Sequence, residues 1–481
     1  MPNFGSRENK NIGWFLTALF LALIGGFLAG YFNLLGLAIV CGLCFFILAC
    51  LFIFNEPFYG VMLITFFLPF ERIGTLEVSS FTLKINHLFG LITIVAWFLT
   101  MLIKKEVRFK KMPIIVPLLL FLLINLLSFT QAANLMRAAT VFLFTLLAIL
   151  IGLTAANLID TKEKLKRTVI VLFLSAFLVT VFGLFQFAGD LSGLPPSITG
   201  LRDLYTKEVF GFPRVHSTAL EPLYFANYLL IPLCLALSLL FGRSKKIKWF
   251  WLLMLIILGL TNFILALSRA AYIALVFSLI ILLFFHFRNL FSLKRIIYAL
   301  VVILAVYFLF VRIFHLTGDF SLYFEKFSTQ VTGIFTGASY TDRADTINQA
   351  WALFKTHPYL GVGTGNFGPE VAWYALVTPE KGWLIVNNEF LEILTETGIF
   401  GLLAFFAWLA VLFIRSFQAV RRAKDAFLKA VMIGLSAAFI GVIIQYQTFS
   451  ILYIIHVWFL FGLMMAVMNL IDQENSDKIK I

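Results

Sequence analysis

Long apolar stretches alternate with short polar connectors along most of this chain. A helix needs about 20 apolar residues to cross the hydrocarbon core of a bilayer. By this criterion we predict about 14 spans, with a range of about 12 to 14, because the third is short, ends at Pro69 and also fits a re-entrant segment. The predicted spans are roughly 13–32, 34–54, 58–70, 85–103, 113–129, 137–158, 168–189, 222–241, 249–267, 270–286, 296–314, 397–414, 429–446 and 450–470.

The composition leads to the same fold class. The 481 residues are 61% hydrophobic and 13% charged, with 57 Phe, and a soluble domain of this size could not bury so much apolar surface. The predicted fold is therefore all-α, a polytopic transmembrane helical bundle with one large extracytoplasmic loop. The first apolar stretch has no cleavage site of small residues, so we expect it to remain as a span.

Basic residues gather in five connectors, near residues 104–111, 162–167, 243–248, 288–295 and 415–429. With the predicted spans, all five fall on the same side of the membrane as both termini. The positive-inside rule makes that side the cytoplasm. The net charge of +13 is then explained by membrane orientation, and binding to nucleic acid is not expected.

The opposite, outer side carries the long polar segments. We divide the chain into N-terminal transmembrane helices at 1–314 with a shorter outer loop near 190–221, a large extracytoplasmic loop at 315–388, and C-terminal transmembrane helices at 389–481. Within the large loop, Asp342 to Lys355 has the pattern of an amphipathic helix. Its apolar face would hold Ile347, Ala350, Trp351 and Phe354, and Arg343 would join that face.

A glycine-rich loop follows this helix, in the sequence HPYLGVGTGNF at 357–367. Pro358 should end the helix, and the glycines then allow a tight turn. No Lys-Ser or Lys-Thr pair follows, so the loop is not a phosphate-binding P-loop. We predict a turn that packs against the membrane.

A polar segment then enters a span, in the sequence VNNEFLEILTETGIFGL at 386–402. Asn387 and Asn388 are good helix N-caps. Glu389 opens a series of carboxylates at helical spacing that continues with Glu392 and Glu396, and Gly398 and Gly401 interrupt the apolar stretch that follows. An ordinary cap and entry turn would account for this segment equally well.

These residues resemble the signature of the O-antigen ligase and polymerase superfamily of bacterial polysaccharide assembly. That signature is a His-Asn pair, nine residues, a Gly, two residues and a second Gly, which matches Asn387-Asn388, Gly398 and Gly401 except that Asn387 replaces the His. Arg343, Trp351 and the segment 357–367 form a second match. The resemblance covers mainly residues 200–402.

The resemblance implies an integral membrane glycosyltransferase of the bacterial cytoplasmic membrane. Such an enzyme transfers a glycan from undecaprenyl pyrophosphate to a sugar hydroxyl of an acceptor glycan or glycolipid, on the outer face, without a metal, cofactor or nucleotide sugar. Its partners are the lipid-linked glycan, the acceptor and membrane lipids. Ligases and polymerases share this motif region, so the two activities stay open.

Four arginines stand on the outer face, where the positive-inside rule expects few. They are Arg202, Arg214, Arg269 and Arg343. Arg269 lies in a turn so short that its side chain must stay near the bilayer surface, where a charge is costly unless it is paired or solvated. Snorkelling or simple solvation could explain each one separately. Together they suit the pyrophosphate of the lipid donor, because a guanidinium presents a fork of donors to phosphate oxygens.

The acceptor hydroxyl needs orientation and deprotonation, and in the family the signature His is the natural base. The amide of Asn387 cannot accept a proton, although it can orient a hydroxyl. We therefore expect Glu389 or Glu221 to act as the base, unless activation of the leaving group carries the reaction. Glu221 precedes Pro222 at a helix start, so helix capping is its alternative role. We assign structural roles to His216 and His357.

Parts of the sequence also fit other functions. Cys41-x-x-Cys44 has no second pair or His nearby, so no metal site is expected. A flippase or transporter of lipid-linked oligosaccharides would fit the span number, but it should show paired repeats and charges at mid-membrane. A non-catalytic glycan-assembly protein is the other alternative, because the signature His is missing.

Overall fold

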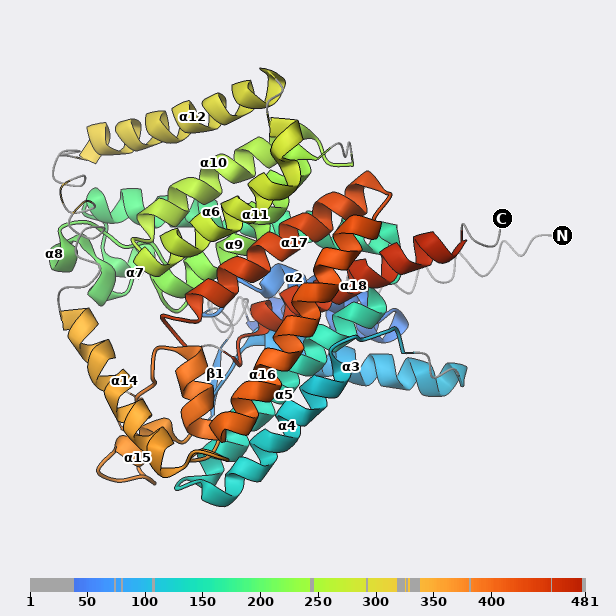
Figure 1. The fold of residues 1–481 in the computed structure, drawn as a ribbon. Helices are drawn as coiled ribbons and strands as arrows, with labels where there is room; N and C mark the ends of the chain where they lie inside the picture. Colours follow the sequence, from blue (N-terminus) through green and yellow to red (C-terminus); the bar gives the residue numbers. More distant parts are fainter. Residues whose placement is uncertain are drawn as a thin grey trace.

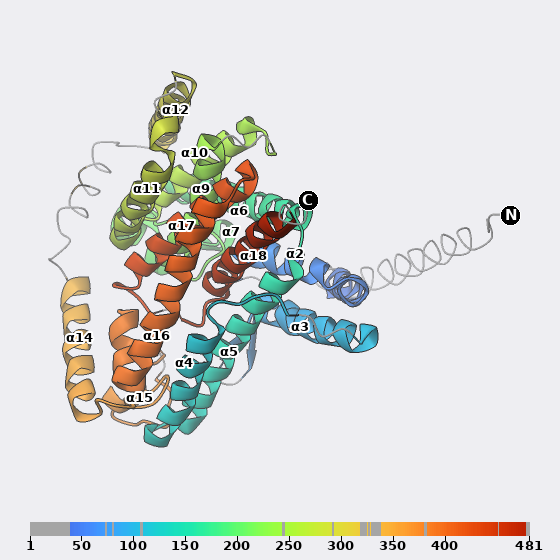
Figure 2. The same cartoon turned by 45° about the vertical axis from the view of Figure 1, so that its right-hand side comes forward.

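The computed structural model describes residues 39–477, except for 73–74, 79–80, 106–108, 243–245, 291–292, 318–324, 326–327, 329–337, 380–381 and 451. The described part is a bundle of helices, shown in two views in Figures 1 and 2. Eight of its helices are long and apolar enough to cross a membrane, and five shorter apolar helices accompany them. The predicted all-α polytopic fold is confirmed, while the predicted first span lies outside the described residues.

The elements follow the predicted spans closely. In chain order they are a helix at Ile39–Asn55, α2 (Phe58–Phe67), β1 (Leu76–Val78), β2 (Phe81–Leu83), α3 (Ile85–Lys104), α4 (Ile115–Ser128), η1 (Phe129–Gln131), α5 (Leu135–Leu158), α6 (Lys162–Leu191), α7 (Pro196–Thr199), η2 (Asp203–Tyr205), α8 (Lys207–Phe210), α9 (Pro222–Phe241), α10 (Trp249–Leu265), α11 (Arg269–Leu290), α12 (Leu293–Thr317), α14 (Ala338–Thr356), α15 (Phe367–Val371), α16 (Glu389–Arg422), α17 (Ala426–Gln445) and α18 (Ile455–Asp477). The strands β1 and β2 form a short antiparallel hairpin in which Leu76 pairs with Leu83.

Helices α9, α17 and α18 form the centre of the bundle, and almost all of their side chains are buried. Small residues let their backbones approach. A Cβ on Gly462 of α18 would overlap the backbone of Gly152 in α5, and a Cβ on Gly434 of α17 would come within 2.9 Å of the Leu235 Cα in α9. Because lipid is as apolar as the side chains, such close packing is a principal source of helix association in a bilayer.

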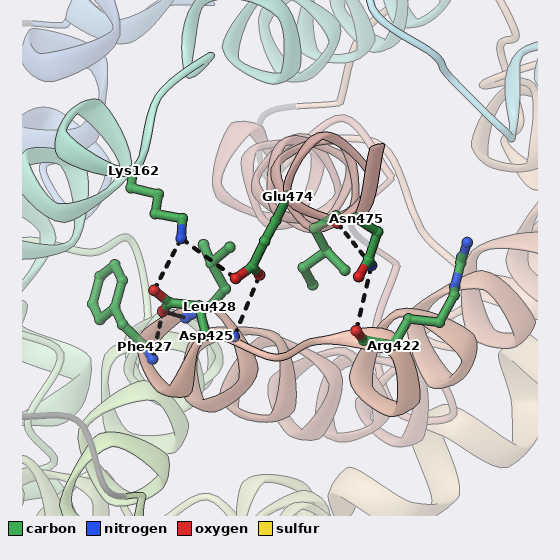
Figure 3. A network of polar contacts seen from close by, with 8 residues as sticks. Lys162, Arg422, Asp425, Phe427, Leu428, Glu474 and Asn475 are labelled. Atoms are coloured by element: carbon green, nitrogen blue, oxygen red, sulfur yellow. Dashed lines mark hydrogen bonds and ion pairs between the residues drawn. The ribbon is translucent and has the colours of Figure 1, made fainter. Parts of the chain in front are cut away.

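One end of the bundle collects the basic connectors (Figure 3). The Lys162 ammonium lies 3.0 Å from the Asp425 carboxylate and 3.8 Å from that of Glu474. Asp425 in turn caps α17 by accepting from the backbone N–H groups of Phe427 and Leu428. Lys111, Arg421, Arg422 and Lys424 line a hollow beside this network. The connectors near residues 104–111, 162–167 and 415–429 therefore share one end, as the sequence predicted.

Helix α14 packs against the start of α16, away from the centre of the bundle (Figures 1 and 2). Its buried face is centred on Ala350, which packs with Phe367 and Val386. The Thr346 hydroxyl on the same face donates to the Val386 carbonyl at 3.1 Å. Trp351 is 46% exposed, so the predicted apolar face is only partly buried. The reason is that the buried face is centred on Thr346 and Ala350, so it is rotated around the helix from the predicted face.

A break in α16 receives the glycine-rich loop. Gly398 has φ 67°, a conformation open to glycine, and this residue interrupts the helical hydrogen bonding. The Thr395 carbonyl instead accepts from the Val362 N–H at 2.9 Å, and the Glu396 carbonyl accepts from the Gly363 N–H at 2.9 Å. The N–H groups of the loop thus donate to the carbonyls that lose their helical partners at the break. The predicted turn packs on α16.

Replacing Gly398 tests how far the fold depends on this junction. A Cβ there would overlap the Tyr359 carbonyl, and φ would be unfavourable in addition. We expect Gly398→Ala to destabilise the protein by roughly 3 kcal/mol or more, measured by thermal unfolding in detergent. Gly382→Ala is the matched control, because Gly382 also has a positive φ but has open space around it. Equal losses of stability in the two variants would contradict the docking argument.

Candidate functional site

Five arginines from distant parts of the chain form what we call the arginine cluster: Arg72, Arg202, Arg214, Arg269 and Arg343. Burial lowers the pKa of Arg343, and the positive charge of Arg269 lowers it further. Burial also lowers the pKa of Arg214, where Arg269 again contributes. In the same way burial and Arg202 lower the pKa of Arg72. The structure therefore brings together the four arginines named from the sequence and adds a fifth.

Backbone carbonyls and one aromatic ring hold the cluster in place. The guanidinium of Arg202 donates to the Leu220 carbonyl at 3.2 Å, and that of Arg214 donates to the Leu267 carbonyl at 3.2 Å. Both guanidiniums lie over the Tyr205 ring, at 5.9 Å and 5.6 Å. These contacts fix the directions in which the guanidiniums of Arg202 and Arg214 point.

Glu221 is the carboxylate that acts on this cluster. It precedes α9 but makes no side-chain cap hydrogen bond to the helix, so the predicted capping alternative is not what the structure shows. Burial raises the pKa of Tyr205, and the negative charge of Glu221 raises it further. The same carboxylate opposes the lowering of the Arg214 pKa. Glu221 thus lies among Tyr205, Arg202 and Arg214.

His216 is buried beside the same arginines. Its Nε2 accepts from the backbone N–H of Arg202 at 3.3 Å and lies 3.4 Å from the Arg72 guanidinium. Burial and the charge of Arg72 lower the pKa of His216 to about 4. The imidazole is therefore neutral near pH 7, and its role there is structural, as the sequence suggested.

The start of α16 supplies the second part of the site. Asn388 is the helix cap, because its side-chain oxygen accepts from the Leu391 N–H at 3.0 Å. Asn387 stands just before it with φ 58°, outside the helix, and its amide donates weakly to the Ile385 carbonyl at 3.4 Å. Glu389 is 3% exposed, and its backbone N–H donates to the Tyr446 carbonyl at 2.8 Å.

The next two carboxylates of α16 fasten neighbouring loops. The Glu396 carboxylate accepts from the backbone N–H groups of Gly365 at 2.6 Å and Phe367 at 3.2 Å. The Glu392 carboxylate accepts from the Val386 N–H at 2.9 Å. Arg137 completes this group, because its Nε donates to the Gly365 carbonyl at 2.6 Å. Their positions indicate that these groups organise the loops that carry Asn387.

Between these parts lies a hollow of about 300 Å³, which we call the polar cavity. A smaller hollow of about 50 Å³ shares Arg137, Val141 and Tyr453 with its lining. Glu389, Glu392 and Glu396 line this smaller hollow, which we include in the polar cavity. In the larger part the Glu71 carboxylate lies 3.8 Å from the Lys84 ammonium and 4.0 Å from the His456 ring. The remaining polar lining is Thr82, Asn86, His87 and Thr140.

The polar cavity and the arginine cluster adjoin each other. Glu71 and Arg72 are consecutive, and Glu71 lines the cavity while Arg72 belongs to the cluster. The Leu220 N–H donates to the Glu71 carboxylate at 3.3 Å, and the Leu220 carbonyl accepts from Arg202. The segment before Glu221 therefore separates a positive surface from a mixed polar hollow.

The predicted site residues fall into two groups. Arg202, Arg214 and Glu221 lie in the arginine cluster with Arg269 and Arg343, while Glu389 lines the polar cavity. Asn387 follows Val386, whose carbonyl contacts Thr346 one turn after Arg343, so it connects the two groups. Gly398 and Gly401 have structural roles. Among the described residues, no three His, Cys, Asp or Glu side chains are placed to share a metal ion.

Sequence reasoning missed Arg72, Lys84 and Arg137. The signal that singled out Arg269 applied to them as well, because each lies at the predicted outer end of a span. Glu71 had no comparable signal. Its importance arises only when the loop after α2 meets α18 and the segment before α9.

Comparison with known families fits this arrangement. Residues 252–406 match the family model described as O-antigen ligase. The match covers 155 of the 481 residues, so this segment of the chain is similar to the O-antigen ligase and polymerase superfamily. The matched segment runs from α10 into α16, and it contains Arg269, Arg343 and the acidic start of α16. The other cluster arginines lie in loops N-terminal to the matched segment. A comparison with curated proteins finds no significant match.

The neutral state of His216 predicts a pH dependence of stability. The folded pKa of about 4 lies below the ordinary value of 6.5, so the unfolded chain binds more protons between these values. The stability that comes from keeping His216 neutral in the folded state is complete above pH 6.5 and is lost as the pH falls toward 4.

At pH 4.5 the expected loss is about 2 to 3 kcal/mol relative to pH 7. Thermal unfolding in detergent at both pH values measures it. His216→Gln keeps an acceptor but cannot titrate, so it should show a smaller drop between the two values. An identical drop in both proteins would contradict the neutral assignment.

Proposed function

We propose that this multi-pass membrane protein transfers a glycan from undecaprenyl pyrophosphate to a sugar hydroxyl of an acceptor, as an O-antigen ligase or polysaccharide polymerase. The observation that carries the proposal is the arginine cluster, which adjoins a cavity lined by carboxylates and amides at one end of the bundle. The match of residues 252–406 to the O-antigen ligase family model supports the reaction class.

We place the site on the extracytoplasmic face of a bacterial cytoplasmic membrane, with both termini in the cytoplasm. The basic connectors support this orientation, because they gather at one end and attract the anionic cytoplasmic surface. Arg202, Arg214 and Arg269 follow or precede the opposite ends of α6, α9 and α11.

The arginine cluster would bind the donor pyrophosphate. The positive charge of Arg269 contributes to the lowered pKa of Arg214 and of Arg343, which reflects repulsion between like charges, and an anion between them would relieve that repulsion. A pyrophosphate at the membrane surface has the charge and depth to do so while its prenyl chain stays in the bilayer. The cluster would also stabilise the negative charge that develops as the glycosyl bond breaks.

The polar cavity would hold the acceptor. Its carboxylates, amides and hydroxyls can exchange hydrogen bonds with sugar hydroxyls, and Tyr453 and Phe144 offer aromatic surface. Its position next to Arg72 would bring an acceptor hydroxyl close to the donor phosphate. This proximity would convert a reaction of two substrates into one within a single complex.

The base is the least determined role. Glu392 and Glu396 already accept backbone hydrogen bonds, so we assign them to positioning. Glu221 lies on the donor side and Glu389 on the cavity side, and either could take the hydroxyl proton. Asn387 would orient the hydroxyl. Because the Asn387 amide is not basic, a non-catalytic role in glycan assembly is the second candidate function.

The arginine proposal predicts a loss of pyrophosphate affinity in conservative variants. We expect Arg269→Lys and Arg343→Lys each to weaken binding about 10-fold or more, because Lys lacks the bidentate fork. The measurement is the thermal shift of the purified protein in detergent with inorganic pyrophosphate. The exposed Arg167→Lys, outside the site, is the control. If all three variants bind equally well, the cluster does not hold the pyrophosphate.

The role of Asn387 predicts a graded effect on transfer from an undecaprenyl-pyrophosphate oligosaccharide. We expect Asn387→Gly to lower the rate by about 10- to 100-fold with an unchanged pH profile, because a positioning contact is lost. Gly is preferable to Ala here, since it accepts φ 58° without strain. Glu389→Gln or Glu221→Gln should cost more if that carboxylate is the base.

The reverse change tests whether the site is catalytic at all. Asn387→His should be tolerated, since His adopts positive φ more readily than most residues, and it should raise transfer near neutral pH. An increase in the transfer rate of Asn387→His over the parent would favour the catalytic role over the non-catalytic one. No transfer by either the parent or Asn387→His, with folded protein and a matched donor, would favour the non-catalytic role.

A further inference from the structure

A second, very different hollow lies between α6 and α10. Its volume is about 540 Å³, and its lining is apolar apart from lysines. Helix α6 contributes Lys166, Ile170, Phe173, Leu174 and Phe177, and the start of α10 with the residues before it contributes Lys246, Ile247, Lys248, Trp251 and Leu255. We call it the lysine groove. None of the described lining residues is acidic.

The charges sit at one end of this groove. Lys246 and Lys248 precede Trp249, the first residue of α10, and Lys166 lies in the second turn of α6. From Lys166 to Phe177 the groove follows α6 for roughly 16 Å, at about 1.5 Å per residue. One half of a bilayer's hydrocarbon core is about 15 Å deep. The groove therefore has the depth of one leaflet, with positive charge at the level of the headgroups.

The two helices are joined away from the lysines. The Asn262 amide of α10 donates to the Thr180 carbonyl of α6 at 2.9 Å. Gly183 of α6 also lies against Asn262, so the helices approach closely there. Toward the lysines they are separated by the hollow, and Leu174 and Trp251 on its walls are about half exposed.

We propose that the lysine groove binds one anionic diacyl phospholipid, with its phosphate among Lys166, Lys246 and Lys248 and an acyl chain along α6 and α10. Charge complementarity carries the choice of ligand, because three lysines and no acidic residue are among the described residues that line the groove, and such a lining favours an anionic headgroup over a zwitterionic one. The apolar wall of one-leaflet depth carries the choice of a lipid over a soluble phosphate.

The bound lipid would complete the packing of α6 against α10. Both helices lead at their far ends to the arginine cluster, since Arg202 follows α6 and Arg269 follows α10. The lipid would therefore act as a structural ligand at the opposite end from the proposed transfer site. This inference stands independently of the proposed reaction.

Native mass spectrometry of the purified protein with phosphatidylglycerol or phosphatidylcholine tests the proposal. The test variant carries Lys166→Gln, Lys246→Gln and Lys248→Gln. The control carries Lys104→Gln, Lys105→Gln and Arg167→Gln, which change the charge equally at exposed positions outside the groove. We expect the parent and the control to retain phosphatidylglycerol and the test variant to bind it at least about 10-fold more weakly.

A second variant separates the groove from the headgroup charges. Leu174→Trp fills the apolar wall without changing a lysine, and it should also weaken phosphatidylglycerol binding. Equal binding of the two phospholipids by the parent would overturn the proposal, as would equal losses in the test and control variants. Displacement of phosphatidylglycerol by an equimolar amount of undecaprenyl phosphate would also overturn it, because the groove would then hold the carrier lipid.

Discussion

The junction between Gly398 and the glycine-rich loop determines how α14 and this loop are placed on α16. A helix break exposes carbonyls that must find donors, and the N–H groups of Val362 and Gly363 supply them. The loop is then fixed on α16, and α14 is fixed with it through Ala350 and its neighbours. This one exchange of hydrogen bonds sets Arg343 on α14 relative to Asn387 before α16.

The cost of charge near a bilayer separates the structural ionisable groups from the functional ones. Arg137 donates to the Gly365 carbonyl and has the carboxylates of Glu392 and Glu396 close by. The arginine cluster gathers five cations from distant segments of the chain, and the charge of Glu221 acts on Arg214. The first group holds neighbouring loops together within the protein. The second group suits an anionic ligand, which is why we assign the donor pyrophosphate to it.

The helical fold could be predicted from the sequence because apolar length and basic connectors are local signals that each segment carries by itself. The arginines could also be identified from the sequence, because each is a basic residue on the predicted outer side, where the positive-inside rule expects few. Glu71 could not be identified in this way, because its role depends on contacts with Lys84, with α18 and with the segment before α9. The exposed Trp351 shows a further limit: periodicity indicates a helical face but not which side of it another helix will cover.

Several described residues of the arginine cluster and the start of α16 are poor candidates for accepting the proton of the acceptor hydroxyl. Asn387 has no basic atom, and His216 already accepts a hydrogen bond from Arg202 and keeps a pKa of about 4. Glu392 and Glu396 are engaged by backbone donors. Glu221 and Glu389 are the carboxylates that we propose for the proton, because one lies in the arginine cluster and the other lines the polar cavity. A catalytic protein would thus have moved the base from the signature position to a neighbouring carboxylate, while a non-catalytic one would need neither of them ionised.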